Sequence, residues 1–238
     1  MEECFKLVEK VVSEYLPEFV LQLKNNQVAK ETFSEICSLL ADVNEIAPTE
    51  IVRSFKEEMH LCTPSVLLII VRPAMDHLFA AYISGAYPLC YHPLRISTEA
   101  LAYSLYIDMN GFSTSGDAFE KLNELQEHLD DKHLPMSSFI KDKLGKVVGE
   151  ELSQRINQMW KQISNDFLHF KGYLIHLNEY VNSDIDAPPP SYAVGAFVSY
   201  DDADKPGLCD LKETVNAFRE LVKEVWDFWK SRHVKNRN

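Results

Sequence analysis

The segment from Val148 to His169 separates its apolar and polar side chains with the period of an α-helix. At 100° per residue, the apolar positions fall on one face and the polar positions on the other. We therefore predict an amphipathic helix here that packs against other helices. The apolar stripe contains Leu152, Ile156, Met159, Trp160, Ile163 and Phe167, and the polar stripe contains Gln158, Gln162, Asn165, Asp166 and His169.

Helical periodicity recurs along the rest of the chain, interrupted by proline, glycine and capping residues. Only 8 glycines occur in 238 residues, which favours helix over a turn-rich β fold. We predict an all-α helical bundle. The helices expected before residue 93 cover 2–24 with a break or kink at Pro17, 29–43, 49–62 with Thr49 as N-cap, and a run that starts at Thr63-Pro64, bends at Pro73 and ends at Gly85. Those expected later cover 93–110 with a stop at Gly111, 117–130 with a capping box from Asp117 to Glu120, and 135–144 closed by Gly145.

The last predicted helix opens with a second capping box, from Asp210 to Glu213. Its apolar positions are spaced like a heptad repeat, which fits either antiparallel packing in a bundle or a dimer interface. Residues 184–207 before it are expected to form an irregular excursion, with room for a β-hairpin. The apolar seam of this helix contains Leu211, Val215, Phe218, Val222, Val225 and Trp229.

No composition shift marks a clear domain boundary. The N-terminal helical segment, 1–62, forms either a separate subdomain or part of the same domain as 63–238.

The formal net charge is −12, which argues against an extended nucleic-acid-binding surface. Five cysteines at wide spacings, with no Cys-x-x-Cys pair, favour reduced thiols over a disulfide or zinc framework. The acidic start is unlike a signal peptide. The longest uninterrupted apolar run, near Val66–Val71, is too short to span a bilayer. We expect a cytoplasmic protein without a membrane partner.

Two polar groupings are candidates for a functional site. Arg95 and Glu99 are one helical turn apart in a segment with little other polar surface, so the pair is expected to be partly buried and to need partners. His169 has Asn165 and Asp166 on its own helix face, and the acidic neighbour would orient its ring. Simpler interpretations are an intrahelical ion pair for Arg95 and Glu99, and a cation at a helix C-terminus for His169.

Two short stretches carry a resemblance to a known family. Leu94–Leu101 is similar to an Arg-x-x-x-Glu-Ala helix, and Ile163–His169 is similar to a Leu-Ser-x-Tyr-Val-His helix end. In this order they resemble a group of HEPN-like helical proteins of mostly unknown function. The HEPN motif is an Arg, a following polar residue and a His later on the same helix; Asn165 and His169 fit, whereas Ser164 stands where the Arg would be.

The resemblance implies a HEPN-like helical bundle within 63–238 and a homodimer. Many HEPN domains are metal-independent ribonucleases of toxin and defence systems. In such a mechanism His169 would transfer a proton, Arg95 would stabilise charge on the phosphate, and Asn165 would orient the phosphate or the ring. Glu99 would hold Arg95, and Asp166 would sit beside the His169 ring.

Three functions follow from these observations. The net charge and the missing motif Arg favour a non-catalytic module that acts through protein contacts and self-association. The alternative is a ribonuclease or nucleotide-processing enzyme that uses His169, with RNA as a partner only in that case. The third is a metal-binding bundle, because Glu57 and His60, like Asp166 and His169, are three residues apart on one helix face. We expect no metal and no cofactor.

Overall fold

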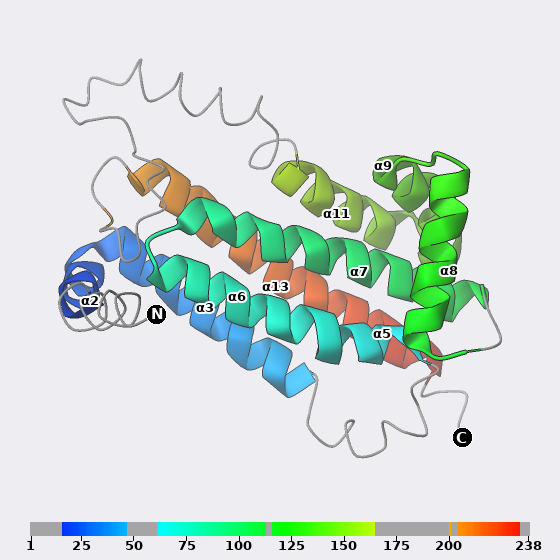
Figure 1. Cartoon of the computed structure of the whole chain (residues 1–238), viewed down its shortest axis with the longest axis horizontal. Helices are drawn as coiled ribbons and strands as arrows, with labels where there is room; N and C mark the ends of the chain where they lie inside the picture. Colours follow the sequence, from blue (N-terminus) through cyan, green and yellow to red (C-terminus); the bar gives the residue numbers. More distant parts are fainter. Residues whose placement is uncertain (1–15, 47–60, 113–115, 165–199, 201–203, 234–238) are drawn as a thin grey trace, which may run out of the picture.

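The computed structural model describes residues 16–46, 61–112, 116–164, 200 and 204–233. Most of these residues are helical and no strand occurs among them, so the predicted all-α bundle is confirmed (Figure 1). The first elements are α2 (Leu16–Asn25), α3 (Gln27–Ile46), α5 (Cys62–Val66), the π-helix η2 (Leu67–Val71), α6 (Arg72–Ile83), the 3₁₀-helix η3 (Tyr87–Cys90) and α7 (Tyr91–Asn110). The later ones are α8 (Ala118–Asp131), α9 (Met136–Ser138), the π-helix η4 (Phe139–Leu144), α10 (Gly145–Val148), α11 (Glu150–Lys161) and α13 (Lys205–His233). The expected helices over 2–15 and 49–60 and the hairpin before residue 200 lie outside the described residues.

Helix α7 is the central element, in contact with α5, α6, α8, α10, α11 and α13 (Figure 1). Its buried face carries small residues, which let neighbouring helices approach closely. The helix ends where the sequence predicts, because Gly111 adopts the left-handed conformation (φ 62°) and its N–H bonds the carbonyl of Ile107 at 3.1 Å. Buried small and apolar residues of α7 are Leu94, Ser97, Ala100, Leu101, Ala102, Ser104, Leu105 and Ile107.

The predicted capping box at α8 is confirmed. The Asp117 carboxylate accepts from the backbone N–H groups of Phe119 (2.8 Å) and Glu120 (3.0 Å), and the Glu120 carboxylate accepts from the Asp117 N–H (3.1 Å). These bonds join residues two and three positions apart, so the local sequence specifies them.

Elements α5, η2 and α6 form one continuous run from Cys62 to Ile83. The π-helical stretch lies directly before the predicted bend at Pro73, whose missing N–H removes a backbone donor. Gly85 (φ 79°) follows its end. Within the described residues, this run is long and apolar enough to cross a membrane by length and composition, and 39% of its most apolar window is buried in the bundle. A core helix and a membrane helix share these properties, so they do not distinguish the two.

Two helix boundaries predicted from local signals are wrong. Gly145 does not close a helix: its φ is −56°, and the chain stays helical to Val148, where Gly149 (φ 92°) follows. A Cβ at Gly145 would lie 3.0 Å from the Ser153 hydroxyl, so this glycine serves a close helix contact. Asp210 is not an N-cap, because α13 begins at Lys205 and the fully buried Leu208 holds the added turn in the core.

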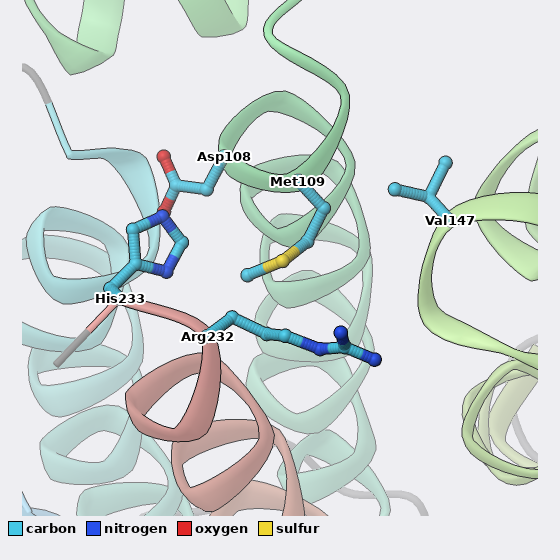
Figure 2. A pocket seen from close by; sticks show the side chains of 5 residues that line it. All are labelled: Asp108, Met109, Val147, Arg232 and His233. Carbon is cyan, nitrogen blue, oxygen red and sulfur yellow. The ribbon is translucent and has the colours of Figure 1, made fainter. Parts of the chain in front are cut away.

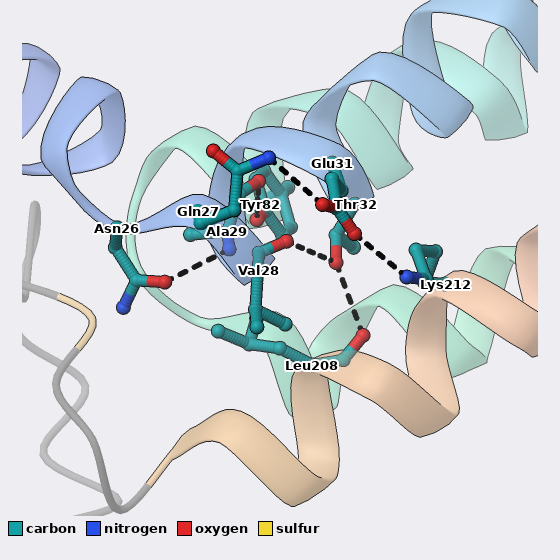
Figure 3. Close-up of polar contacts among 9 residues, drawn as sticks. All are labelled: Asn26, Gln27, Val28, Ala29, Glu31, Thr32, Tyr82, Leu208 and Lys212. Carbon is teal, nitrogen blue, oxygen red and sulfur yellow. Dashed lines mark hydrogen bonds and ion pairs between the residues drawn. The ribbon is translucent and has the colours of Figure 1, made fainter.

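The apolar seam of α13 is buried within the chain itself. Thr32 donates to the Leu208 carbonyl (3.1 Å), and Lys212 pairs with Glu31 (2.9 Å) at the next level (Figure 3). Further along, Lys223 pairs with Asp42 at 2.9 Å. Residue numbers rise together on both helices, so α13 runs parallel to α3. The apolar side of α11 is buried in the same way, at Leu152, Ile156 and Met159, and so is Ile163 just after its end.

Candidate functional site

Arg95 and Glu99 form the predicted ion pair on α7. The Arg95 Nε–H donates to Glu99 Oε1 at 3.0 Å, and the side chains are 33% and 28% exposed. Partial exposure means that the pair is neither sealed in the core nor fully solvated. It lies where a second molecule could reach it.

Trp160 of α11 joins this pair. Its indole N–H donates to the same Glu99 oxygen at 2.7 Å, and the Arg95 guanidinium carbon lies 5.8 Å from the centre of its ring. Sequence patterning placed Trp160 only in the apolar stripe of α11. Helical geometry places it on the side opposite His169, so the available signal was the indole N–H itself, which usually needs an acceptor when it is buried. We call Arg95, Glu99 and Trp160 the Glu99 cluster.

The Glu99 cluster leaves hydrogen-bonding groups unused. Both donors to Glu99 reach Oε1, and Arg95 uses only its Nε–H. Within the described part of the chain, Glu99 Oε2 and the two terminal NH₂ groups of Arg95 make no hydrogen bond. A guanidinium held at Nε and against an indole ring is oriented before it meets an anion.

Towards the start of α7 exposed apolar side chains occur near the Glu99 cluster, together with the exposed His92. Ile96 is 55% exposed and Leu89 is 47% exposed. Towards the end of α7 the surface closes, because Tyr103 packs edge-on against Phe139 at 5.1 Å. Burial, together with the charges of Glu99 and Asp130, raises the pKa of Tyr103 to about 12, so its hydroxyl stays neutral.

The other predicted site residues, Asn165, Asp166 and His169, lie outside the described residues. Their expected approach to Arg95 stays a prediction. Ser164, at the position of the HEPN motif Arg, is fully buried, and its hydroxyl has no hydrogen-bond partner in the described part of the chain.

A second polar centre, which the sequence did not reveal, lies at the far end of α7. Asp108 accepts from the backbone N–H groups of Cys62 and Thr63, each at 2.8 Å, and from the Trp229 indole N–H at 2.8 Å. It thereby caps α5 from another helix. The predicted start at Thr63-Pro64 is therefore shifted to Cys62, whose preceding residue offers no side-chain cap. The Thr63-Pro64 pattern predicted a cap from a neighbouring residue, whereas the cap comes from Asp108, which is distant in the sequence.

The two buried thiols, Cys62 and Cys90, do not suit a catalytic role. Burial raises the pKa of Cys62 to about 12, with a further contribution from Asp108, and burial also raises the pKa of Cys90. A nucleophilic cysteine needs the opposite shift. Among the residues that the structure describes, no group of three or more His, Cys, Asp or Glu side chains could hold a metal ion. Glu57, His60 and His169 of the metal hypothesis lie outside that part.

Comparison of the chain with models of protein families, with curated proteins and with solved structures yields no match.

Proposed function

We propose that the protein is a non-catalytic helical module of the cytoplasm that self-associates through the exposed face of α7. The observation that carries the proposal is the partly exposed Glu99 cluster together with the exposed Ile96 on α7, which follows the exposed Leu89 of η3. Exposed apolar residues beside oriented, incompletely paired charges are typical of protein contact surfaces.

The unused groups of the Glu99 cluster are complementary to each other. A two-fold axis across α7 at the level of residue 97 would place Arg95 of one copy opposite Glu99 of the other, because both are two residues from that level. The free guanidinium nitrogens of each copy then meet the free Oε2 of its partner. A two-fold contact forms this pair twice. Local attraction of this kind is needed because each copy carries a net charge of −12.

The apolar part of the surface is tested by Ile96→Glu, with Leu21→Glu as the matched control. Leu21 is 59% exposed on α2, away from α7. Sedimentation equilibrium should show that Ile96→Glu weakens association by about tenfold or more, whereas Leu21→Glu associates like the parent protein. A monomeric parent protein at high micromolar concentration contradicts the proposal.

The charged part of the surface is tested by reversing the charge of Arg95 or of Glu99. Arg95→Glu places two Glu side chains opposite each other, and Glu99→Arg places two Arg side chains together, so each variant alone should remain monomeric. An equimolar mixture of the two restores both opposite-charge pairs and should form a heterodimer. If the mixture associates no better than either variant alone, Arg95 and Glu99 do not meet across the interface.

The second candidate is the metal-independent ribonuclease. The observation in its favour is the oriented Arg95 guanidinium, whose terminal NH₂ groups suit a developing phosphate charge. In this proposal His169 takes the 2′-hydroxyl proton or protonates the leaving oxygen, Asn165 orients the phosphate, and Asp166 orients the His169 ring. Glu99 keeps Arg95 in place.

The purified protein should then cleave RNA in the presence of EDTA, and both His169→Ala and Arg95→Ala should abolish the cleavage. Arg72→Ala, which removes an Arg from another helix, is the control for lost positive charge. Absence of EDTA-resistant cleavage, or cleavage that persists in His169→Ala, eliminates this candidate.

A further inference from the structure

The sequence contains a single Asn-Gly pair, and it lies at the end of α7, where Asn110 is the last helical residue and Gly111 follows. Both residues are exposed. Asparagine before glycine is chemically labile, because glycine has no side chain to hinder attack of its backbone nitrogen on the Asn side chain. A Cβ at Gly111 would meet no atom within 4 Å, so neighbouring side chains do not shield this position either.

The backbone conformation at this point holds the reaction back. The attacking atom is the Gly111 nitrogen, and its N–H is bonded to the Ile107 carbonyl at 3.1 Å. That hydrogen bond directs the nitrogen along the helix and away from the Asn110 side-chain carbon. Attack therefore requires the last turn of α7 to open first.

The last turn of α7 is loosely supported on its inner side. A cavity of about 390 Å³ lies beside it, and Figure 2 shows the side chains that line this space. Empty volume next to a turn means that few contacts oppose its opening. The hydrogen bonds of Asp108 hold the helix up to that residue, so the part left to open is Met109 to Gly111. The lining consists of Asp108, Met109, Val147, Arg232 and His233.

Phe112 is the contact that keeps this helix end closed. Its ring centre lies 6.2 Å from that of Tyr106 on α7 and 5.7 Å from that of His128 on α8. An apolar contact between the residue after a left-handed glycine and the end of the helix commonly stabilises such a stop. Packing of Phe112 therefore determines how often the Gly111 nitrogen is released.

We propose that Asn110 is a site of spontaneous deamidation whose rate is controlled by opening of the last turn of α7. In the open turn the Gly111 nitrogen loses its proton and forms a bond to Asn110 Cγ. The side-chain NH₂ leaves with that proton as ammonia, and a five-membered succinimide remains. Water then breaks one of the two C–N bonds of the ring, which gives aspartate or isoaspartate at position 110. The only co-reactant is water.

Either product loosens the end of α7. A carboxylate at position 110 lies at the negative end of the helix dipole, two residues after the carboxylate of Asp108. Isoaspartate also adds a CH₂ group to the main chain, which shifts the Gly111 N–H relative to the Ile107 carbonyl. The change is irreversible, and it does not rest on the proposed self-association.

The test is incubation of the folded full chain at neutral pH and physiological temperature, followed by peptide mass spectrometry and enzymatic methylation of isoaspartate. Asn110 should convert to aspartate and isoaspartate, and Asn110→Gln should show no conversion at this position over the same period. Phe112→Ala should accelerate the conversion by about fivefold or more, because the open fraction rises. Phe119→Ala is the matched control, since it removes a Phe that is 39% exposed on α8, and it should keep the parent rate.

Two sets of results overturn the proposal. If Asn110 stays intact in the folded chain while it converts in the urea-unfolded chain, the native turn does not open. If the folded and unfolded chains convert equally fast, or Phe119→Ala is accelerated as much as Phe112→Ala, the end of α7 does not control the reaction. Thermal unfolding shows whether each variant is folded, and Phe112→Leu decides the question if Phe112→Ala is not.

Discussion

Helix α7 carries two carboxylates that each accept a hydrogen bond from a tryptophan indole, and the two differ in how fully they are used. Asp108 takes three donors on both oxygens, one from α13 and two from α5. Glu99 takes two donors on one oxygen, from its own helix and from α11. The first centre has both carboxylate oxygens engaged within the fold and joins three helices. The second keeps an open oxygen next to an exposed apolar surface.

The difference separates a structural role from an interaction role. A carboxylate with all its neighbours inside the fold contributes chiefly to stability, and its loss leaves donors unpaired. A half-exposed carboxylate contributes little to stability and has bonding capacity for another molecule. The following predictions test this contrast, from the largest expected effect to the smallest.

Asp108→Ala should destabilise the protein most. It leaves two backbone N–H groups at the start of α5 and the Trp229 indole without an acceptor, at a cost of about 3 kcal/mol in the free energy of unfolding. Urea denaturation followed by circular dichroism measures this cost. A loss below about 1 kcal/mol would mean that water replaces the carboxylate as the acceptor of these three N–H groups.

Loss of the Trp229 indole N–H should destabilise the protein more than loss of the Trp160 indole N–H. Trp229→Phe removes the N–H that reaches Asp108 and part of a buried stack, and should cost about 1.5 kcal/mol. Trp160→Phe removes the N–H that reaches the half-exposed Glu99, and should cost about 0.5 kcal/mol. The same denaturation experiment compares them, and equal losses would remove the distinction between the two centres.

The ion pairs of Asp42 on α3 make part of the protein's stability depend on pH. Burial alone would raise the pKa of its carboxyl, but hydrogen bonds and charges from Arg219 and Lys223 outweigh burial and hold the pKa below its usual value. Stability from a lowered pKa is present above the unfolded pKa of about 3.9 and is lost as pH falls through the folded value.

Asp42→Asn should therefore cost about 1 kcal/mol at neutral pH and a smaller amount in acid, as the pH falls through the lowered pKa of Asp42. Urea unfolding at the two pH values is the measurement. A cost that stays the same in acid would assign the effect to packing instead of charge.

Glu99→Gln should change stability least, by a few tenths of a kcal/mol, because its amide oxygen can still accept from Trp160. It should nevertheless weaken self-association, since the carboxylate that faces the partner's Arg95 is lost. Sedimentation and unfolding on the same sample separate the two effects. A large loss of stability with unchanged association would reverse the roles assigned to Glu99 and Asp108.

The sequence by itself determined the features that depend on residues three or four positions apart. The all-α class, the stop at Gly111, the capping box at Asp117 and the Arg95–Glu99 contact all belong to this group, because helical geometry fixes which of these residues meet.

Only the tertiary structure decided the rest. Asp108 caps a helix that starts 45 residues earlier in the sequence. Trp160 donates to Glu99 from α11. Burial of Leu208 lets α13 begin at Lys205, before the start predicted at Asp210. Each of these depends on which helices lie side by side. Helix contacts are determined by burial of whole faces in one core, and no local pattern of residues specifies that arrangement.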